Sequence, residues 1–195
     1  DASQENFLGC YIARRQNVDP GGDSRWWLYD ATVNPAPDDS SAAIMLVDAC
    51  EQVPPPGSTE PEYDDQGSPV ALLASYINAI NRREYERAWE YWDSPPNPTF
   101  EDFQEGFAGT DEAFLVVSPP TIYEGAAGSV YTSVPAVLMA TQSASGRQAF
   151  VGCYVLRRSN VDDTPPEWHL YDATISELST GSPGVDLLAG ACPAP

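Results

Sequence analysis

The chain has 195 residues, of which 42% are hydrophobic, and this is enough apolar material for one core and part of a second. Its 29 acidic and 9 basic side chains give a formal charge of −20, and because such a surface repels phosphate groups we expect neither nucleic acid nor anionic membranes as partners. No apolar run approaches the roughly 18 residues that a membrane-spanning helix needs.

The first predicted element is a pair of strands over residues 7–33, and a similar pair recurs at 150–175. The first pair opens with "FLGCYIARRQNV" and the second with "FVGCYVLRRSNV", and each continues into a strand that contains "LYDAT". With one gap in the intervening loop, more than half of the aligned positions are identical. Predicted helices and strands over 68–149 precede the second pair but have no counterpart before the first. We therefore interpret residues 1–50 as a partial repeat, the closing strands and tail of an incomplete domain.

The four cysteines occupy matching places in the two repeats. Cys10 and Cys153 lie in the first strand of each pair, and Cys50 and Cys192 lie near the end of each tail. The simplest pairing is within each repeat, as Cys10–Cys50 and Cys153–Cys192, which implies an oxidising compartment. Metal ligation or free thiols are the alternatives, but the chain has no CxxC spacing and one histidine, so we expect no metal and no cofactor.

Residues 51–67 read as a linker rich in proline and acidic residues, and we expect it to be exposed to solvent. Its carboxylates could coordinate Ca²⁺, but their spacing matches no calcium-binding loop. The acidic residues concerned are Glu60, Glu62, Asp64 and Asp65.

Two helices are predicted next. Ser68 followed by Pro69 is a typical helix start, the sequence "NRRE" at 81–84 is expected to break the helix, and "DSPPNP" at 93–98 ends the second one. Thr99 and Asp102 predict the cap of a further short helix. Apolar residues at helical spacing predict core-facing stripes: Leu72, Leu73, Tyr76, Ile77 and Ile80, then Tyr85, Ala88, Trp89 and Trp92, then Phe100, Phe103 and Phe107.

Four strands follow the helices. The stretches 113–123, 129–141, 147–158 and 166–175 are rich in β-branched and aromatic residues and are separated by turn sequences. Helices first and a meander of strands second predict an α+β fold, with N-terminal helices packed on a curved antiparallel sheet, preceded by a second partial copy of that sheet. We expect residues 68–195 to form the complete domain.

This order of elements resembles the nuclear transport factor two-like superfamily, whose cone-shaped α+β fold is shared with ketosteroid isomerases and polyketide cyclases. The stretch "ASYINAINRREYERAWEYW" at 74–92 resembles its opening helices, and 134–158 and 167–175 resemble its long central and closing strands. The resemblance covers 68–177 as one whole domain and 5–35 as the final strands of another. The paired cysteines are similar to those of secreted bacterial members. The resemblance implies a fold, and it leaves the activity open.

Catalysis of the ketosteroid isomerase type needs an Asp base inside an apolar cone. Asp172 is the candidate, but it recurs as Asp30 in the other "LYDAT" copy, and a structural role is the preferred interpretation. His169 corresponds to Trp27 in the first repeat, which argues against a general base. An apolar cavity for a small molecule would be lined by Tyr76, Trp89, Trp92, Met139, Trp168 and Asp172, although the same aromatic residues could simply fill the core.

The first repeat should expose apolar side chains and an unpaired strand edge unless something covers them. We expect self-association with identical or tandem copies through Phe7, Leu8, Tyr11, Ile12, Trp26, Trp27 and Tyr29. The preferred hypothesis is a non-catalytic structural module, located outside the cell or on its surface, that is a repeat of a surface or filament-forming assembly. A small-molecule-binding domain with an apolar cone is the first alternative, and an isomerase- or cyclase-like enzyme is the second.

Overall fold

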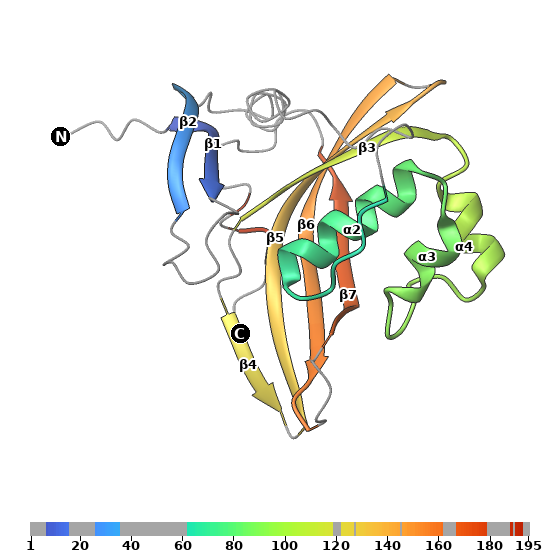
Figure 1. Ribbon diagram of the computed structural model, residues 1–195. Helices are drawn as coiled ribbons and strands as arrows, with labels where there is room; N and C mark the ends of the chain where they lie inside the picture. Colours follow the sequence, from blue (N-terminus) through green and yellow to red (C-terminus); the bar gives the residue numbers. More distant parts are fainter. Residues whose placement is uncertain are drawn as a thin grey trace.

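The computed structural model describes residues 7–15, 26–35, 62–118, 122–126, 128–144, 146–161, 167–178, 188 and 190–192. Within these residues the chain forms a two-stranded hairpin and, separately, a five-stranded antiparallel sheet covered on one face by helices (Figure 1). The predicted α+β architecture is therefore confirmed. No helix in this described part is long and apolar enough to cross a membrane.

Three helices lie where the sequence predicts them: α2 (Pro69–Asn81), α3 (Tyr85–Glu90) and α4 (Phe100–Gly106). The Ser68 side chain accepts a hydrogen bond from the Ala71 N–H, and the Thr99 side chain accepts one from the Asp102 N–H, so both predicted caps are present. Every residue of the first predicted stripe lies on the buried face of α2.

The strands of the main sheet are β3 (Thr110–Val117), β4 (Ile122–Ala126), β5 (Ser129–Gln142), β6 (Gly146–Ser159) and β7 (Trp168–Glu177). Their order is β3-β5-β6-β7, and β4 pairs with β5 on the same side as β3. The prediction of one strand over 113–123 is wrong, because this stretch is divided between β3 and β4.

Pro135 explains why the pairing changes at this point. It lies inside the central strand β5, and its carbonyl accepts the Ser118 N–H at 2.9 Å, on the side that faces β3 and β4. A proline has no N–H to donate on that same side, so the ladder loses a rung. The pairing of β3 ends at Ala136 and that of β4 begins at Ser133, so the proline sits between the two ladders.

Two hydrophobic clusters lie on opposite faces of the sheet. The first and larger cluster joins α2, α3 and α4 to the face formed by residues such as Val134, Tyr154 and Leu170. The second contains Val137 and Met139, against which Leu188, seven residues before the end of the chain, packs. The Cys153–Cys192 disulfide fastens the tail beside this second cluster, as the sequence predicts, and such a bridge is typical of an oxidising compartment.

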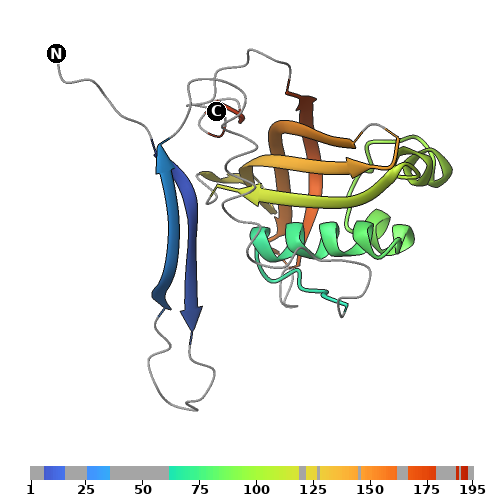
Figure 2. The same ribbon diagram turned by 90° about the horizontal axis from the view of Figure 1, so that it is seen from above.

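The hairpin consists of β1 (Phe7–Arg15) and β2 (Trp26–Pro35), which pair with each other and with no strand of the main sheet. Figure 2 shows it standing beside the helix-covered domain. Cys10 is a free cysteine in this structure, so the predicted Cys10–Cys50 bridge is not observed; Cys50 itself lies outside the described residues.

Candidate functional site

The β1–β2 ladder has the same register as the β6–β7 ladder. Cys10 pairs with Thr32 in the hairpin, and Cys153 pairs with Thr174 in the main sheet. The partners are the same residue types at equivalent positions of the two repeats. The sequence likeness therefore extends to the way in which the strands are paired.

The two ladders also share a bulge. In the first ladder the register shifts after Ile12, which leaves Tyr29 between two paired residues of β2. In the second it shifts after Val155, which leaves Tyr171 in the same situation. A bulge bends a strand and redirects its side chains, so a shared bulge indicates that the two hairpins present the same sequence positions on the same face.

In the main sheet, one face of β6–β7 is covered by helices. Tyr154, Leu156, Trp168 and Leu170 are buried in the first hydrophobic cluster together with residues of α2. The Arg158 guanidinium lies 5.0 Å from the centre of the Trp168 ring. Burial also raises the pKa of Tyr154 above its usual range, which is consistent with a dry environment. This face of a β6–β7-type hairpin is thus suited to a helical cover.

The corresponding positions of β1–β2 carry similar residues, namely Tyr11, Ala13, Arg15, Trp26 and Leu28. Val33 occupies the position of Ile175, which packs against the first cluster, yet Val33 is 43% exposed. The seven predicted interface residues lie on β1 and β2, and all of them except Tyr29, which is at the bulge, have a paired residue in this ladder.

The six residues predicted to line an apolar cavity are not brought together. Tyr76, Trp92 and Trp168 are buried in the first cluster, where the rings of Tyr76 and Trp92 meet edge-on at 6.0 Å, while Trp89 packs on the rings of α4. Met139 belongs to the second cluster on the other face of the sheet. The cavity prediction is wrong for Met139, because the alternation of side chains along β5 turns it away from the helices. It is also wrong for Asp172, because that side chain is exposed.

Asp172 does not fit the role of a buried catalytic base. Its side chain is exposed, and its Oδ1 accepts the N–H of Ala173 at 2.8 Å. His169 is half-buried and is paired in register with Arg157 of β6. Neither residue stands in an apolar pocket with a second polar group converging on it, so the geometry that isomerase-type catalysis needs is missing at these positions.

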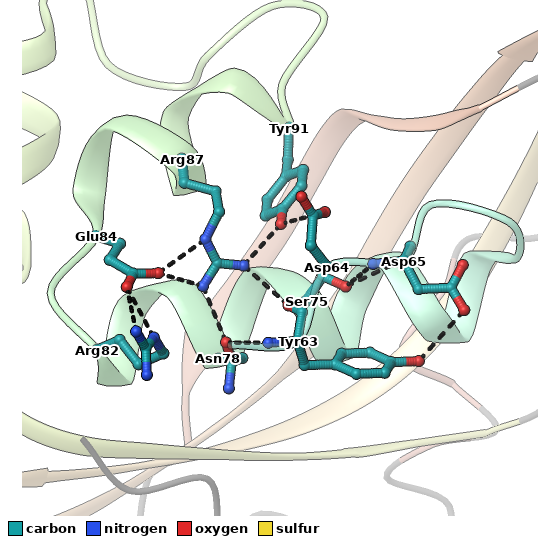
Figure 3. Close-up of polar contacts among 9 residues, drawn as sticks. All are labelled: Tyr63, Asp64, Asp65, Ser75, Asn78, Arg82, Glu84, Arg87 and Tyr91. Carbon is teal, nitrogen blue, oxygen red and sulfur yellow. Dashed lines mark hydrogen bonds and ion pairs between the residues drawn. The ribbon is translucent and has the colours of Figure 1, made fainter. Parts of the chain in front are cut away.

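A network of hydrogen bonds connects residues 63–65 to α2, α3 and Tyr91 (Figure 3). The Asp65 N–H donates to Ser75 Oγ at 2.8 Å, and the Tyr91 hydroxyl donates to Asp64 at 2.9 Å. Burial is the main cause that raises the pKa of Tyr91 to about 12. The end of the predicted linker is therefore hydrogen-bonded to the helices, while Tyr63, Asp64 and Asp65 remain exposed to solvent, as expected for a linker. Sequence reasoning missed this because the partners lie on later helices.

Arg87 is the centre of this network. Its Nε and Nη2 donate to Glu84, Nη2 also donates to Asn78, and Nη1 donates to the Tyr63 carbonyl and to the Tyr91 hydroxyl. A guanidinium has five N–H donors, so all of them are used within the protein. Arg87 therefore has a structural role, and none of its donors is left for a ligand.

Among the residues that the structure describes, hollows lie at two places beside the helices. The larger, about 430 Å³, is a shallow polar depression over the start of α3, with Glu62, Arg83, Glu86 and Gln104 among its lining residues. The smaller, about 180 Å³, is an apolar groove between α2 and β3. No group of three or more metal-ligating side chains occurs among the residues that the structure describes.

Neither the protein-family models nor the curated proteins contain a match to this chain.

Proposed function

We propose that the protein is a non-catalytic extracellular interaction module, a repeat of a surface or filament-forming assembly that associates with identical or tandem copies through the β1–β2 hairpin. The observation that carries the proposal is the register that β1–β2 shares with β6–β7, including the bulge at Tyr29 and Tyr171. A hairpin of this construction is covered by helices in the complete domain, and β1–β2 has no strand partner in the main sheet.

Under this proposal, residues 1–50 are the closing part of one domain of the nuclear transport factor two-like superfamily, 51–67 is the connection, and 68–195 is a complete domain of the same kind. Helices that cover one face of an antiparallel sheet support this assignment. The Cys153–Cys192 disulfide supports a location outside the cell or on its surface, since structural disulfides persist in oxidising compartments.

A role in binding an apolar small molecule has less support. The four aromatic residues expected to line the cavity fill the first cluster instead, and the apolar groove of about 180 Å³ is smaller than the roughly 300–1,000 Å³ of typical ligand sites.

The test compares the full chain with a variant that lacks residues 1–50, using sedimentation equilibrium. We expect the full chain to self-associate as its concentration rises to roughly 100 µM, a range that reveals weak interfaces. The shortened variant should stay monomeric and keep its melting temperature, because the clusters and the disulfide of the complete domain are retained. A full chain that remains monomeric throughout would contradict the proposal.

A further inference from the structure

The outer edges of the main sheet, at β7 and at β3, are each covered over part of their length. Along β7, the Trp168 N–H donates to the Gln66 carbonyl, and Leu170 exchanges backbone hydrogen bonds with Tyr91 and Asp93. These bonds cover the first part of this edge, at Trp168 and Leu170. An uncovered edge would offer free backbone groups to another strand.

Along β3, the covering is incomplete. The Asn81 side chain accepts the Ala113 N–H at 2.7 Å and donates to the Ala113 carbonyl at 2.9 Å, so the backbone groups of Ala113 face away from β5. Because these directions alternate along a strand, Leu115 and Val117 also turn their N–H and C=O outward. No described residue bonds these outward groups, so two rungs of the edge are open with respect to the described part of the chain.

The apolar groove lies directly beside this open edge. It is lined by Val70, Leu73, Ala74, Ile77, Phe114, Leu115 and Val117. Val70 is 42% exposed on its rim. Helix α2 and the edge of β3 are therefore available side by side to a strand pair from outside. The hairpin β6–β7 is covered in a similar way, by α2 on one face and by β5 along one edge.

The distribution of charged residues favours β1 of another copy as the segment that binds in the groove. The chain carries a formal charge of −20, so most of its surface repels another copy. Strand β1 contains no acidic residue and ends in Arg14 and Arg15. Strand β3 has no charge from Ala113 to Val117, but Asp111 and Glu112 precede this stretch. An antiparallel arrangement sets the arginines of one strand beside the carboxylates of the other while their uncharged parts align.

We propose that β1 of one copy pairs antiparallel with the open edge of β3 in a second copy, with the hairpin seated in the groove between α2 and β3. The inference rests on the proposed function, since it names the partner surface of the associating hairpin. Each copy then has one hairpin and one groove, so the contact is head-to-tail, and it generates a ring or a filament. In this arrangement β6–β7 keeps its place in its own sheet, whereas in a domain swap the hairpin of another copy would replace it.

The first test places a charge on the groove rim of the full chain. Val70→Lys should weaken self-association at least about tenfold, because the contact would bury an unpaired ammonium group. The matched control is Val161→Lys, since Val161 is 72% exposed and lies in the loop after β6. Both side chains are exposed, so both variants should keep the melting temperature of the unmodified chain. Equal association of the two variants would overturn the inference.

The second test exchanges charges between the partners. Arg14→Glu and Asp111→Arg should each weaken association, and the chain that carries both changes should recover most of the loss, because the pair is re-formed in the reverse sense. Asp111 accepts a hydrogen bond from the Ser143 hydroxyl, so the melting temperature of each variant is measured as well. Failure of the double variant to recover would exclude the antiparallel arrangement.

The two proposals can fail separately. If the full chain associates and removal of residues 1–50 abolishes this, while Val70→Lys and Asp111→Arg have no effect, then the hairpin is the associating element and the groove is not its partner. If the full chain never associates, the proposed function itself fails.

Discussion

Gly152 is the position where the packing of β6 against β7 is most easily tested. A Cβ atom added here would lie 2.0 Å from the Thr174 carbonyl oxygen and 2.7 Å from the Ile175 Cα, whereas ordinary contact begins at 3.4 Å. The difference from 2.0 Å to 3.4 Å means that β7 must shift by about 1.4 Å. The obstructing atoms belong to the backbone of β7, so a rotamer change cannot relieve the clash.

The expected cost of Gly152→Ala follows from this shift. Overpacking costs about 1–3 kcal/mol, and two weakened rungs of the ladder add about 1 kcal/mol each, so the free energy of unfolding should fall by about 3–5 kcal/mol. Urea unfolding at neutral pH measures this change. Gly125→Ala is the matched control, because Gly125 is also in a strand but has no atom within 4 Å of an added Cβ. A loss of less than about 0.5 kcal/mol for Gly152→Ala would refute the reasoning.

Other perturbations address the bridge and the polar network. Replacing Cys153 and Cys192 by serine opens a loop that spans a sequence separation of 39, and the free energy of unfolding should fall by about 4 kcal/mol in urea titrations. Arg87→Met leaves five hydrogen bonds unmade, and we expect a loss of about 2–3 kcal/mol in the same assay, less than for a fully buried pair because Glu84 is partly exposed. Hydrogen bonds from Arg82, and then from Arg87, lower the pKa of Glu84 below its ordinary value of 4.5, so its contribution to stability is present above that pH and is lost as the pH falls through the folded-state pKa. Glu84→Gln should therefore be less stable at neutral pH but lose less stability between about pH 5 and pH 3, as thermal melts at several pH values would report.

The elements with local signals were predictable from the sequence. The start of α2 depends on Ser68 and Pro69, which are adjacent to the residues they cap, and its core-facing stripe depends on a spacing within a single helix. The disulfide Cys153–Cys192 was predictable because the internal repeat supplied a comparison that one copy alone does not provide.

Features that depend on contacts between distant residues were not predictable. The division between β3 and β4 depends on the N–H that Pro135 lacks, and the sequence does not tell which side of β5 that residue faces. The docking of Asp64 and Asp65 depends on Ser75 and Tyr91, which the fold brings to them. The six cavity residues were grouped by type, but only the strand register separates Met139 from the aromatic residues under the helices.

The hairpin deserves a functional interpretation because its likeness to β6–β7 includes positions whose demands are visible in the complete domain. Gly152 is required there by the close approach of β7, and Gly9 holds the same place opposite Val33. Trp168 is buried under the ring-stacked Arg158, and the first repeat has Trp26 and Arg15 at these positions. A tryptophan on a strand pair that remained exposed to water would not contribute to the stability of the fold. A large exposed apolar face is instead typical of a surface that binds a partner. The sequence of β1–β2 therefore matches that of a hairpin that is packed in the main sheet, and this match is what the proposed association would explain.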